Sequence, residues 1–219
     1  MKTCIASGLV PLLRIFFNLL YHQFAWSYDI VSGIVSIGMW NEWIKSVLPE
    51  LAGQRILELG HGPGHLQISL LQKGKLVAGI DLSPQMGHIS GKRIRKANLQ
   101  PLLVNGASQR LPFPDNSFNQ IVSTFPTQYI FSTNTIEEIY RVLNTYGEFI
   151  ILPVAWITGG NLLHKMAAWL FKVTGESTEL DEEKLSSDLS QFERFGFSTE
   201  FEIRELENSQ VLILRGKKM

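Results

Sequence analysis

The 219-residue sequence has few of the features that mark disulfide-rich, metal-binding or nucleic-acid-binding proteins. Its single cysteine, Cys4, excludes an internal disulfide and any metal site built from several cysteines, and it fits a reducing compartment. Twenty Lys and Arg residues balance twenty Asp and Glu residues, so no net charge attracts nucleic acid or anionic lipid. We therefore expect no metal and no nucleic-acid partner.

The sequence also has no uninterrupted apolar run of the roughly 20 residues that a membrane-spanning helix requires. Residues 1–26 come nearest, but Arg14 interrupts them and no small-residue cleavage pattern follows. Apolar residues recur at helical spacing from Leu9 to Phe24, which predicts an amphipathic helix that covers the core, forms a lid or lies at a membrane surface. We expect a cytoplasmic protein, with peripheral membrane contact left open.

What the sequence does contain is an apolar content of 45%, enough for the core of one large domain. From residue 54 on, short runs of Ile, Leu and Val alternate with amphipathic stretches, which is typical of βαβ units in a mostly parallel sheet. The expected strands are 54–60, 75–81, 100–104, 118–124 and 147–154, the expected helices are 64–73, 84–97, 133–143, 161–173 and 178–195, and an antiparallel hairpin follows from 197 to 214. We divide the chain into an N-terminal helical lid, residues 1–50, and a core, residues 51–219.

Glycines cluster where the first predicted strand turns into a helix. The segment ILELGHGPGHL, residues 56–66, contains Gly60, Gly62 and Gly64. Glycine allows a tight turn and the close approach of a ligand, and the helix that follows offers unpaired N–H groups. Dinucleotide-binding proteins space such glycines as G-x-G-x-x-G, whereas here His65 stands at the place of the third glycine. The loop predicts a ligand site, and its spacing alone leaves a nicotinamide cofactor open.

An acidic residue ends the second predicted strand, in the segment GIDLSP at residues 79–84. The carboxylate of Asp81 can accept hydrogen bonds from both hydroxyls of a ribose. Ser83 ahead of Pro84 is a suitable helix N-cap, so the cap does not require Asp81. Because parallel strands bring their ends to one edge of the sheet, we expect a nucleoside between Asp81 and the glycine loop.

Four segments, in order and at normal spacing, resemble the signature of class I S-adenosylmethionine-dependent methyltransferases. They are ILELGHGPGHL, GIDLSPQM, ASQRLPFPDNSFNQIVSTF and EEIYRVLNTYGEFIIL. The resemblance covers most of the chain and implies a Rossmann-like α/β fold, with a seven-stranded, mostly parallel sheet, helices on both faces and a reversed last strand. More loosely, Tyr28-Asp29 with Ser36, Gly38 and Trp43 is similar to the entry segment of the ubiquinone and menaquinone biosynthesis methyltransferases.

The resemblance implies S-adenosylmethionine as the cofactor and assigns its contacts. Asp81 would hold the ribose hydroxyls, while Leu82 and Met86 would flank the adenine. Relatives often carry an acid where this chain has Ala107. Either Ser108 or a backbone carbonyl then accepts from the adenine amino group, or the affinity falls by about 1–3 kcal/mol for the unpaired group. The predicted cofactor-binding residues are Tyr28, Glu58, Gly60, Gly62, Gly64, Asp81, Leu82, Met86, Ser108, Gln109 and Phe125.

A sulfonium methyl group is already activated, so such an enzyme mainly aligns the reactants and excludes water. A phenol oxygen or an acidic carbon as acceptor additionally needs a base. The candidates are Asp29, His61 and Tyr129, with His22 and His164 on apolar helices where a packing role is favoured. His61 lies in the glycine loop, where contact with the cofactor carboxylate is favoured over proton transfer.

The acceptor is expected to be small and lipophilic, aromatic or quinone-like, because aromatic residues gather around residues 9–24 and 161–173. The same residues are also explained by core packing. One basic cluster stands on the helix after Asp81, and a solvated helix face explains it: Lys92, Arg93, Arg95 and Lys96. A nicotinamide-dependent oxidoreductase and a non-catalytic, membrane- or partner-binding relative are the alternatives, and the oligomeric state is left open.

Overall fold

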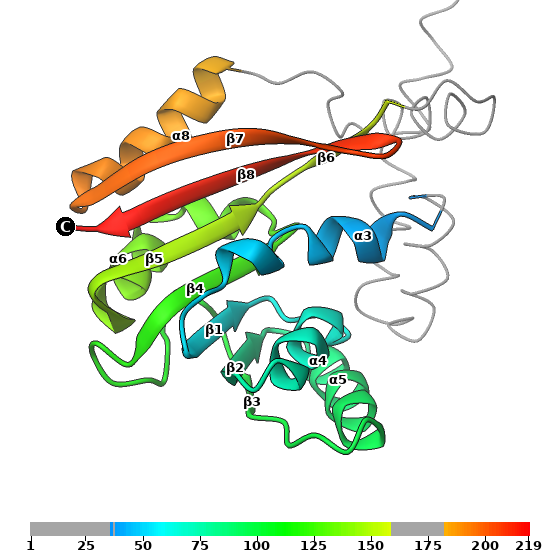
Figure 1. Ribbon diagram of the computed structural model, residues 1–219. Coiled ribbons are helices and arrows are strands. Elements are labelled where there is room, and N and C mark those ends of the chain that lie inside the picture. The colour runs from blue at the N-terminus through cyan, green and yellow to red at the C-terminus, as the bar shows by residue number, and fades with distance from the viewer. Residues whose placement is uncertain (1–35, 37, 159–181) are drawn as a thin grey trace, which may run out of the picture.

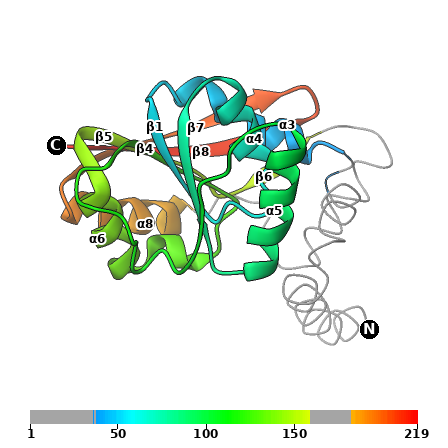
Figure 2. The same cartoon turned by 90° about the horizontal axis from the view of Figure 1, so that it is seen from below.

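The computed structural model describes Ser36, residues 38–158 and residues 182–219. These residues form a twisted sheet with helices on both sides, and α4 and α5 lie together at one end while α6 and α8 lie at the other (Figures 1 and 2). The helices are α3 (Trp40–Lys45), η2 (Leu48–Glu50), α4 (His65–Gln72), α5 (Pro84–Lys96), η3 (Gln128–Phe131), α6 (Thr133–Val142) and α8 (Glu182–Arg194). The strands are β1 (Arg55–Leu59), β2 (Leu76–Asp81), β3 (Leu103–Asn105), β4 (Phe118–Thr124), β5 (Leu143–Leu152), β6 (Ala155–Ile157), β7 (Phe197–Leu206) and β8 (Ser209–Lys218).

The sheet has a parallel part and an antiparallel part. The strand order is β3-β2-β1-β4-β5-β8-β6, and β7 pairs with β8 outside this path. Strands β1 to β5 pair in parallel, whereas β8 runs antiparallel to β5, β6 and β7. The parallel sheet and the antiparallel C-terminal hairpin predicted from the sequence are confirmed.

The described sheet contains eight strands, because the three-residue β6 adds to the seven of the predicted fold. The hairpin turn consists of Glu207 and Asn208, so Ser209 already belongs to β8. Strand β3 begins at Leu103, later than the predicted 100–104, and β5 begins at Leu143, earlier than the predicted 147–154. The predicted helix at 161–173 lies outside the described residues, as does the start of the helix predicted at 178–195.

Two apolar layers cover the two faces of the sheet. Because side chains alternate along a strand, Leu57 and Leu59 of β1 join one buried cluster, with α6 and α8, while Ile56 joins the other, with α3 and α4. Trp43 is buried in the second cluster, and its indole Nε1 donates to Ser209 Oγ at 2.8 Å. The described part of the region that we assign to an N-terminal lid therefore packs against the sheet.

No helix in residues 38–158 or 182–219 is long and apolar enough to cross a membrane. The amphipathic helix predicted between Leu9 and Phe24 lies outside the described residues, so its three interpretations stay predictions.

Candidate functional site

The strand order reverses between β1 and β4, since β2 and β3 follow on one side of β1 while β4 and β5 continue on the other. In open α/β sheets, ligands bind outside the carboxyl ends of the strands at such a switch point. Gly60 follows β1 and Phe125 follows β4, so these two residues stand at its two sides. The glycine loop predicted from the sequence thus lies where the topology favours a ligand.

Each glycine of the loop between β1 and α4 has a left-handed φ: 71° at Gly60, 50° at Gly62 and 85° at Gly64. A Cβ atom at Gly60 would lie 2.6 Å from the Tyr129 hydroxyl, and one at Gly64 would lie 2.2 Å from Ser90 Oγ. A Cβ at Gly62 would meet nothing within 4 Å. Gly60 and Gly64 are therefore required by internal packing, whereas Gly62 leaves open space that a ligand can fill.

Asp81 joins the loop to the end of β2. Its Oδ2 accepts a hydrogen bond from the Gly62 N–H at 2.9 Å, and its Oδ1 accepts one from the Ser83 N–H at 2.8 Å. Ser83 caps α5, as predicted, because its Oγ accepts from the Met86 N–H at 3.3 Å and Pro84 follows it. The Asp81 carboxylate retains lone pairs for further donors, as a ribose would supply.

Glu58, the last residue but one of β1, is only 2% exposed. Its Oε2 accepts a hydrogen bond from Gln67 Nε2 at 2.8 Å. Burial raises the pKa of Glu58 to about 8, and the negative charge of Asp81 acts in the same direction. At neutral pH the Glu58 carboxyl group is therefore mostly protonated in the folded chain.

His61 is buried within the loop, at 3% exposure. Its Nδ1 lies 2.8 Å from the Gly62 carbonyl oxygen, so Nδ1 carries the proton and donates. Nε2 has no hydrogen-bond partner among the residues that the structure describes. Burial lowers the pKa of His61, although Asp81 counteracts this, so the imidazole is neutral.

An aromatic stack borders the switch point after β4. The ring of Phe125 stacks on Trp40 of α3, with centroids 4.4 Å apart and planes inclined by 25°. Phe125 has a φ of 51°, which is rare for a bulky residue, and its N–H donates to the Leu152 carbonyl at 2.7 Å. Backbone strain of this kind concentrates at functional sites.

The other predicted site residues lie in different surroundings. The Tyr129 hydroxyl donates to the Leu59 carbonyl at 3.4 Å and so faces the glycine loop. Ser108 is buried, and its Oγ lies 3.3 Å from Thr135 Oγ1 of α6. Leu82 is 70% exposed, Met86 is 1% exposed and Gln109 is exposed. Tyr28, Asp29, His22 and His164 lie outside the described residues.

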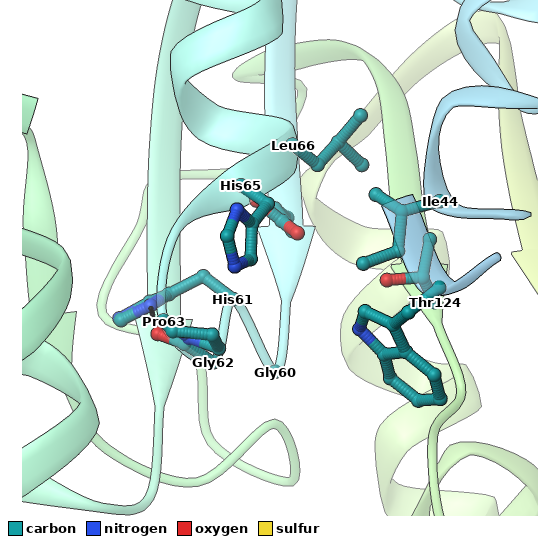
Figure 3. A pocket seen from close by; sticks show the side chains of 10 residues that line it. Ile44, Gly60, His61, Gly62, Pro63, His65, Leu66 and Thr124 are labelled. Carbon is teal, nitrogen blue, oxygen red and sulfur yellow. Dashed lines mark hydrogen bonds between the residues drawn. The ribbon is translucent and has the colours of Figure 1, made fainter. Parts of the chain in front are cut away.

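The residues around the loop enclose a small cavity (Figure 3). The figure shows the loop and His65 on one side and Ile44 and Thr124 on the other. The full lining is Trp40, Ile44, Glu58, Gly60, His61, Gly62, Pro63, His65, Leu66 and Thr124. Glu58, His61 and the glycines were expected here from the sequence, whereas Trp40 and Ile44 were not, because no motif connects α3 with a loop some twenty residues later.

Comparisons with known proteins agree with this geometry. Residues 56–147, from β1 into β5, match a family model described as a methyltransferase domain. The demethylmenaquinone methyltransferase of Symbiobacterium thermophilum is 29% identical over 62% of this chain and 58% of its own length. The ubiquinone/menaquinone biosynthesis C-methyltransferase of Bartonella quintana is 28% identical over 70% of this chain and 63% of its own length. The chain thus spans about three fifths of these curated relatives.

A solved structure supports the fold. The geranyl diphosphate C-methyltransferase of Streptomyces coelicolor, solved with S-adenosylhomocysteine, matches 81% of this chain and 76% of its own chain with a TM-score of 0.61. At 11% identity, this likeness concerns the fold alone. The glycine spacing alone leaves both a nicotinamide cofactor and S-adenosylmethionine open, and the family match decides for S-adenosylmethionine. Residues 56–147 thus form a class I S-adenosylmethionine-dependent methyltransferase domain, and the cofactor of such domains is S-adenosylmethionine.

Proposed function

We propose that this chain transfers a methyl group from S-adenosylmethionine to a small, lipophilic acceptor that is aromatic or quinone-like. The observation that carries the proposal is the arrangement at the switch point. There the glycine loop, which Asp81 holds at Gly62, and Trp40, which stacks on Phe125, line one cavity. The names of the two curated relatives support a quinone-like ring, and stacked aromatic side chains favour a planar apolar partner.

The described residues fit the cofactor at four points. The open space above Gly62 allows close approach to the backbone. The Asp81 carboxylate stands at the end of β2, where ribose hydroxyls can donate to it. Glu58 offers a buried carboxyl group on the wall of the cavity, whose oxygens can accept hydrogen bonds from an amino group. Leu82, with 70% of its surface exposed, offers an apolar side chain beside Asp81 for an adenine ring.

The cavity accounts for only the inner end of the proposed site. Its volume of about 30 Å³ holds a water molecule, whereas ligand pockets usually measure 300–1,000 Å³. The rest of the cofactor would extend along the open surface from Gly62 to Leu82. The aromatic acceptor would then approach from the side of Trp40 and Phe125, opposite the loop.

When bound, S-adenosylmethionine supplies a methyl group that its positive sulfur has already activated. The chain's own residues then have to bind, orient and exclude water. We assign the orienting role to Asp81 and the loop backbone, and the exclusion of water to Trp40 and Phe125. His61 and Tyr129 contact the loop itself, at the Gly62 and Leu59 carbonyls, so we assign them to its support rather than to proton transfer.

Calorimetry tests the cofactor part of the proposal. The full chain should bind S-adenosylmethionine and S-adenosylhomocysteine, and Asp81→Ala should weaken both at least about tenfold, because it removes a charged acceptor for the ribose. Glu207→Gln, in the exposed turn of the β7–β8 hairpin, should change nothing. Equal binding by wild type and Asp81→Ala would overturn the assignment.

Methylation assays test the acceptor class. Purified protein, labelled cofactor and separate pools of hydroquinones, phenols and polar amines would be analysed by mass spectrometry. We expect label in the lipophilic aromatic pools. Transfer confined to the polar amines would refute the acceptor class while leaving the cofactor assignment intact.

A further inference from the structure

Four cationic residues on α5 form the basic cluster noted in the sequence, and one of them differs from the others. Lys92, Arg95 and Lys96 are exposed, as expected for a solvated helix face. Arg93 is half-buried and reaches back to the glycine loop. Its Nη1 donates to the Pro63 carbonyl at 2.9 Å and lies 2.9 Å from His65 Nε2.

The second contact fixes the state of His65. A guanidinium group only donates hydrogen bonds, so His65 Nε2 must be the acceptor and the ring proton must sit on Nδ1. Arg93 Nη1 thereby donates one hydrogen bond to the Pro63 carbonyl and one to His65 Nε2. These acceptors flank Gly64: Pro63 precedes it in the loop, and His65 is the first residue of α4.

The start of α4 needs such a restraint. Its N-cap is Gly64, in the left-handed conformation, and no side chain caps the helix. Glycine is the most flexible residue, so the loop has a large conformational freedom to lose when it takes one shape. Ser90, one helical turn before Arg93, already packs against Gly64. Helix α5 thus holds the loop at two points of the same face.

We propose that Arg93 is a positioning residue, which locks the Gly60–Gly64 loop into its ligand-receiving shape by joining the Pro63 carbonyl to the His65 imidazole. The inference rests on the proposed function and deepens it. Arg93 contributes through the loop rather than through contact with the reacting atoms. The planar guanidinium fixes the directions of the two Nη1 protons, whereas a lysine ammonium is a point donor on a flexible stem, so the geometry of Arg93 matters as well as its charge.

The test compares Arg93→Ala and Arg93→Lys with Arg95→Ala, a matched loss of an exposed arginine from the same helix. Affinity for S-adenosylhomocysteine is measured by calorimetry. We expect Arg93→Ala to weaken binding about tenfold, Arg93→Lys to recover little of that loss, and Arg95→Ala to stay near wild type. Equal affinities of wild type and Arg93→Ala, or the same loss in Arg95→Ala, would overturn the proposal. Full recovery by Arg93→Lys would also overturn it, because charge alone would then suffice.

Hydrogen exchange of the ligand-free protein gives a second readout. In Arg93→Ala the amides of residues 60–66 should exchange faster, while those of β5 and β8 stay as in wild type. Unchanged exchange in the loop would contradict the proposal, as would a uniform rise that signals general destabilisation. If Arg93→Ala fails to fold, Arg93→Lys provides the same comparison. If the wild type binds no S-adenosylhomocysteine, the proposed function fails, and the exchange experiment still decides the role of Arg93.

Discussion

At the scale of single residues, the surroundings of Glu58 disfavour the negative charge that a glutamate normally carries. It is a carboxylic acid, yet it is almost completely buried beside a second acid, Asp81, and its hydrogen-bond donor is the neutral amide of Gln67. A buried group in this position minimises its free energy by keeping its proton. The folded chain therefore binds one more proton than the unfolded chain over a wide pH range.

This difference predicts how stability depends on pH. The pKa of Glu58 rises from 4.5 in the unfolded chain to about 8 in the folded chain, so its stabilising contribution is complete below pH 4.5 and is lost as pH rises through 8. Glu58→Gln carries no proton to lose. We expect the free energy of unfolding in urea to fall less steeply from pH 5 to pH 8 in Glu58→Gln than in wild type.

The exposed Glu207→Gln is the control, and its slope should match that of the wild type. Parallel slopes for wild type and Glu58→Gln would show that Glu58 ionises normally in the folded chain.

Sequence patterns could not single out Arg93 or Trp40 at this scale. Lys92, Arg93, Arg95 and Lys96 form one charged run, and no pattern tells which side chain folds back, since that depends on where α5 lies relative to the loop. Trp40 acquires its role only through stacking on Phe125, which is 85 residues away in sequence. Glu58, the glycines and Asp81 could be found because their spacing is local.

At the scale of elements, the sequence predicted strands well where they are buried and apolar. Strands β1, β2 and β4 lie within a residue of the expected positions. The beginning of β5 was missed because it is polar and irregular: Tyr146 has a φ of 62°, and the register with β4 shifts near Phe118. Strand β6 was not predicted, because three residues are too few to show the alternation of apolar and polar side chains that marks a strand.

The C-terminal end of α6 shows how a distant strand completes an element. Lys218 of β8 donates from Nζ to the carbonyls of Tyr140 at 2.7 Å and Leu143 at 2.8 Å, and its ammonium lies 4.2 Å from the centroid of the Tyr140 ring. These carbonyls belong to the last turn and C-cap of α6, where a cation is favoured.

We expect Lys218→Met to lower the free energy of unfolding by about 1–3 kcal/mol, because buried carbonyls lose their donor. Lys217→Met removes the neighbouring lysine, whose side chain is 56% exposed, and should have little effect. The measurement is urea denaturation of both variants. Equal losses would mean that the cap contributes nothing beyond a surface charge.

At the scale of the whole molecule, one ion-pair network ties the segment before β1 to the C-terminal hairpin. Glu50 of η2 accepts from Arg204 Nη2 at 2.6 Å and from Arg215 Nε at 2.9 Å, and Arg204 also donates to the Ser46 carbonyl. Burial alone would raise the pKa of Glu50, but the two arginines outweigh it and lower the pKa below 4.5. The network joins parts of the chain more than 150 residues apart.

We expect Glu50→Gln to destabilise the protein by about 1–2 kcal/mol at pH 7, because two arginines lose their counter-charge. Since the folded pKa of Glu50 is lowered, the difference from wild type should persist above pH 4.5 and shrink as the pH falls through the folded pKa. Urea denaturation at several pH values measures it. A difference that stays constant in acid would exclude ionisation of Glu50 as its source.

The pairing of β1 with β4 joins segments more than sixty residues apart, and it has a consequence for the order in which the candidate site is assembled. A partly folded chain that has built only β1, α4 and β2 already holds the glycine turn and its aspartate, yet it lacks Thr124 and Phe125. Local units of this kind form early, and long-range pairing comes later. We therefore expect the ability to bind a nucleoside to appear only at the end of folding. Binding of a nucleoside would then indicate a completely folded chain and not merely the presence of the glycine motif.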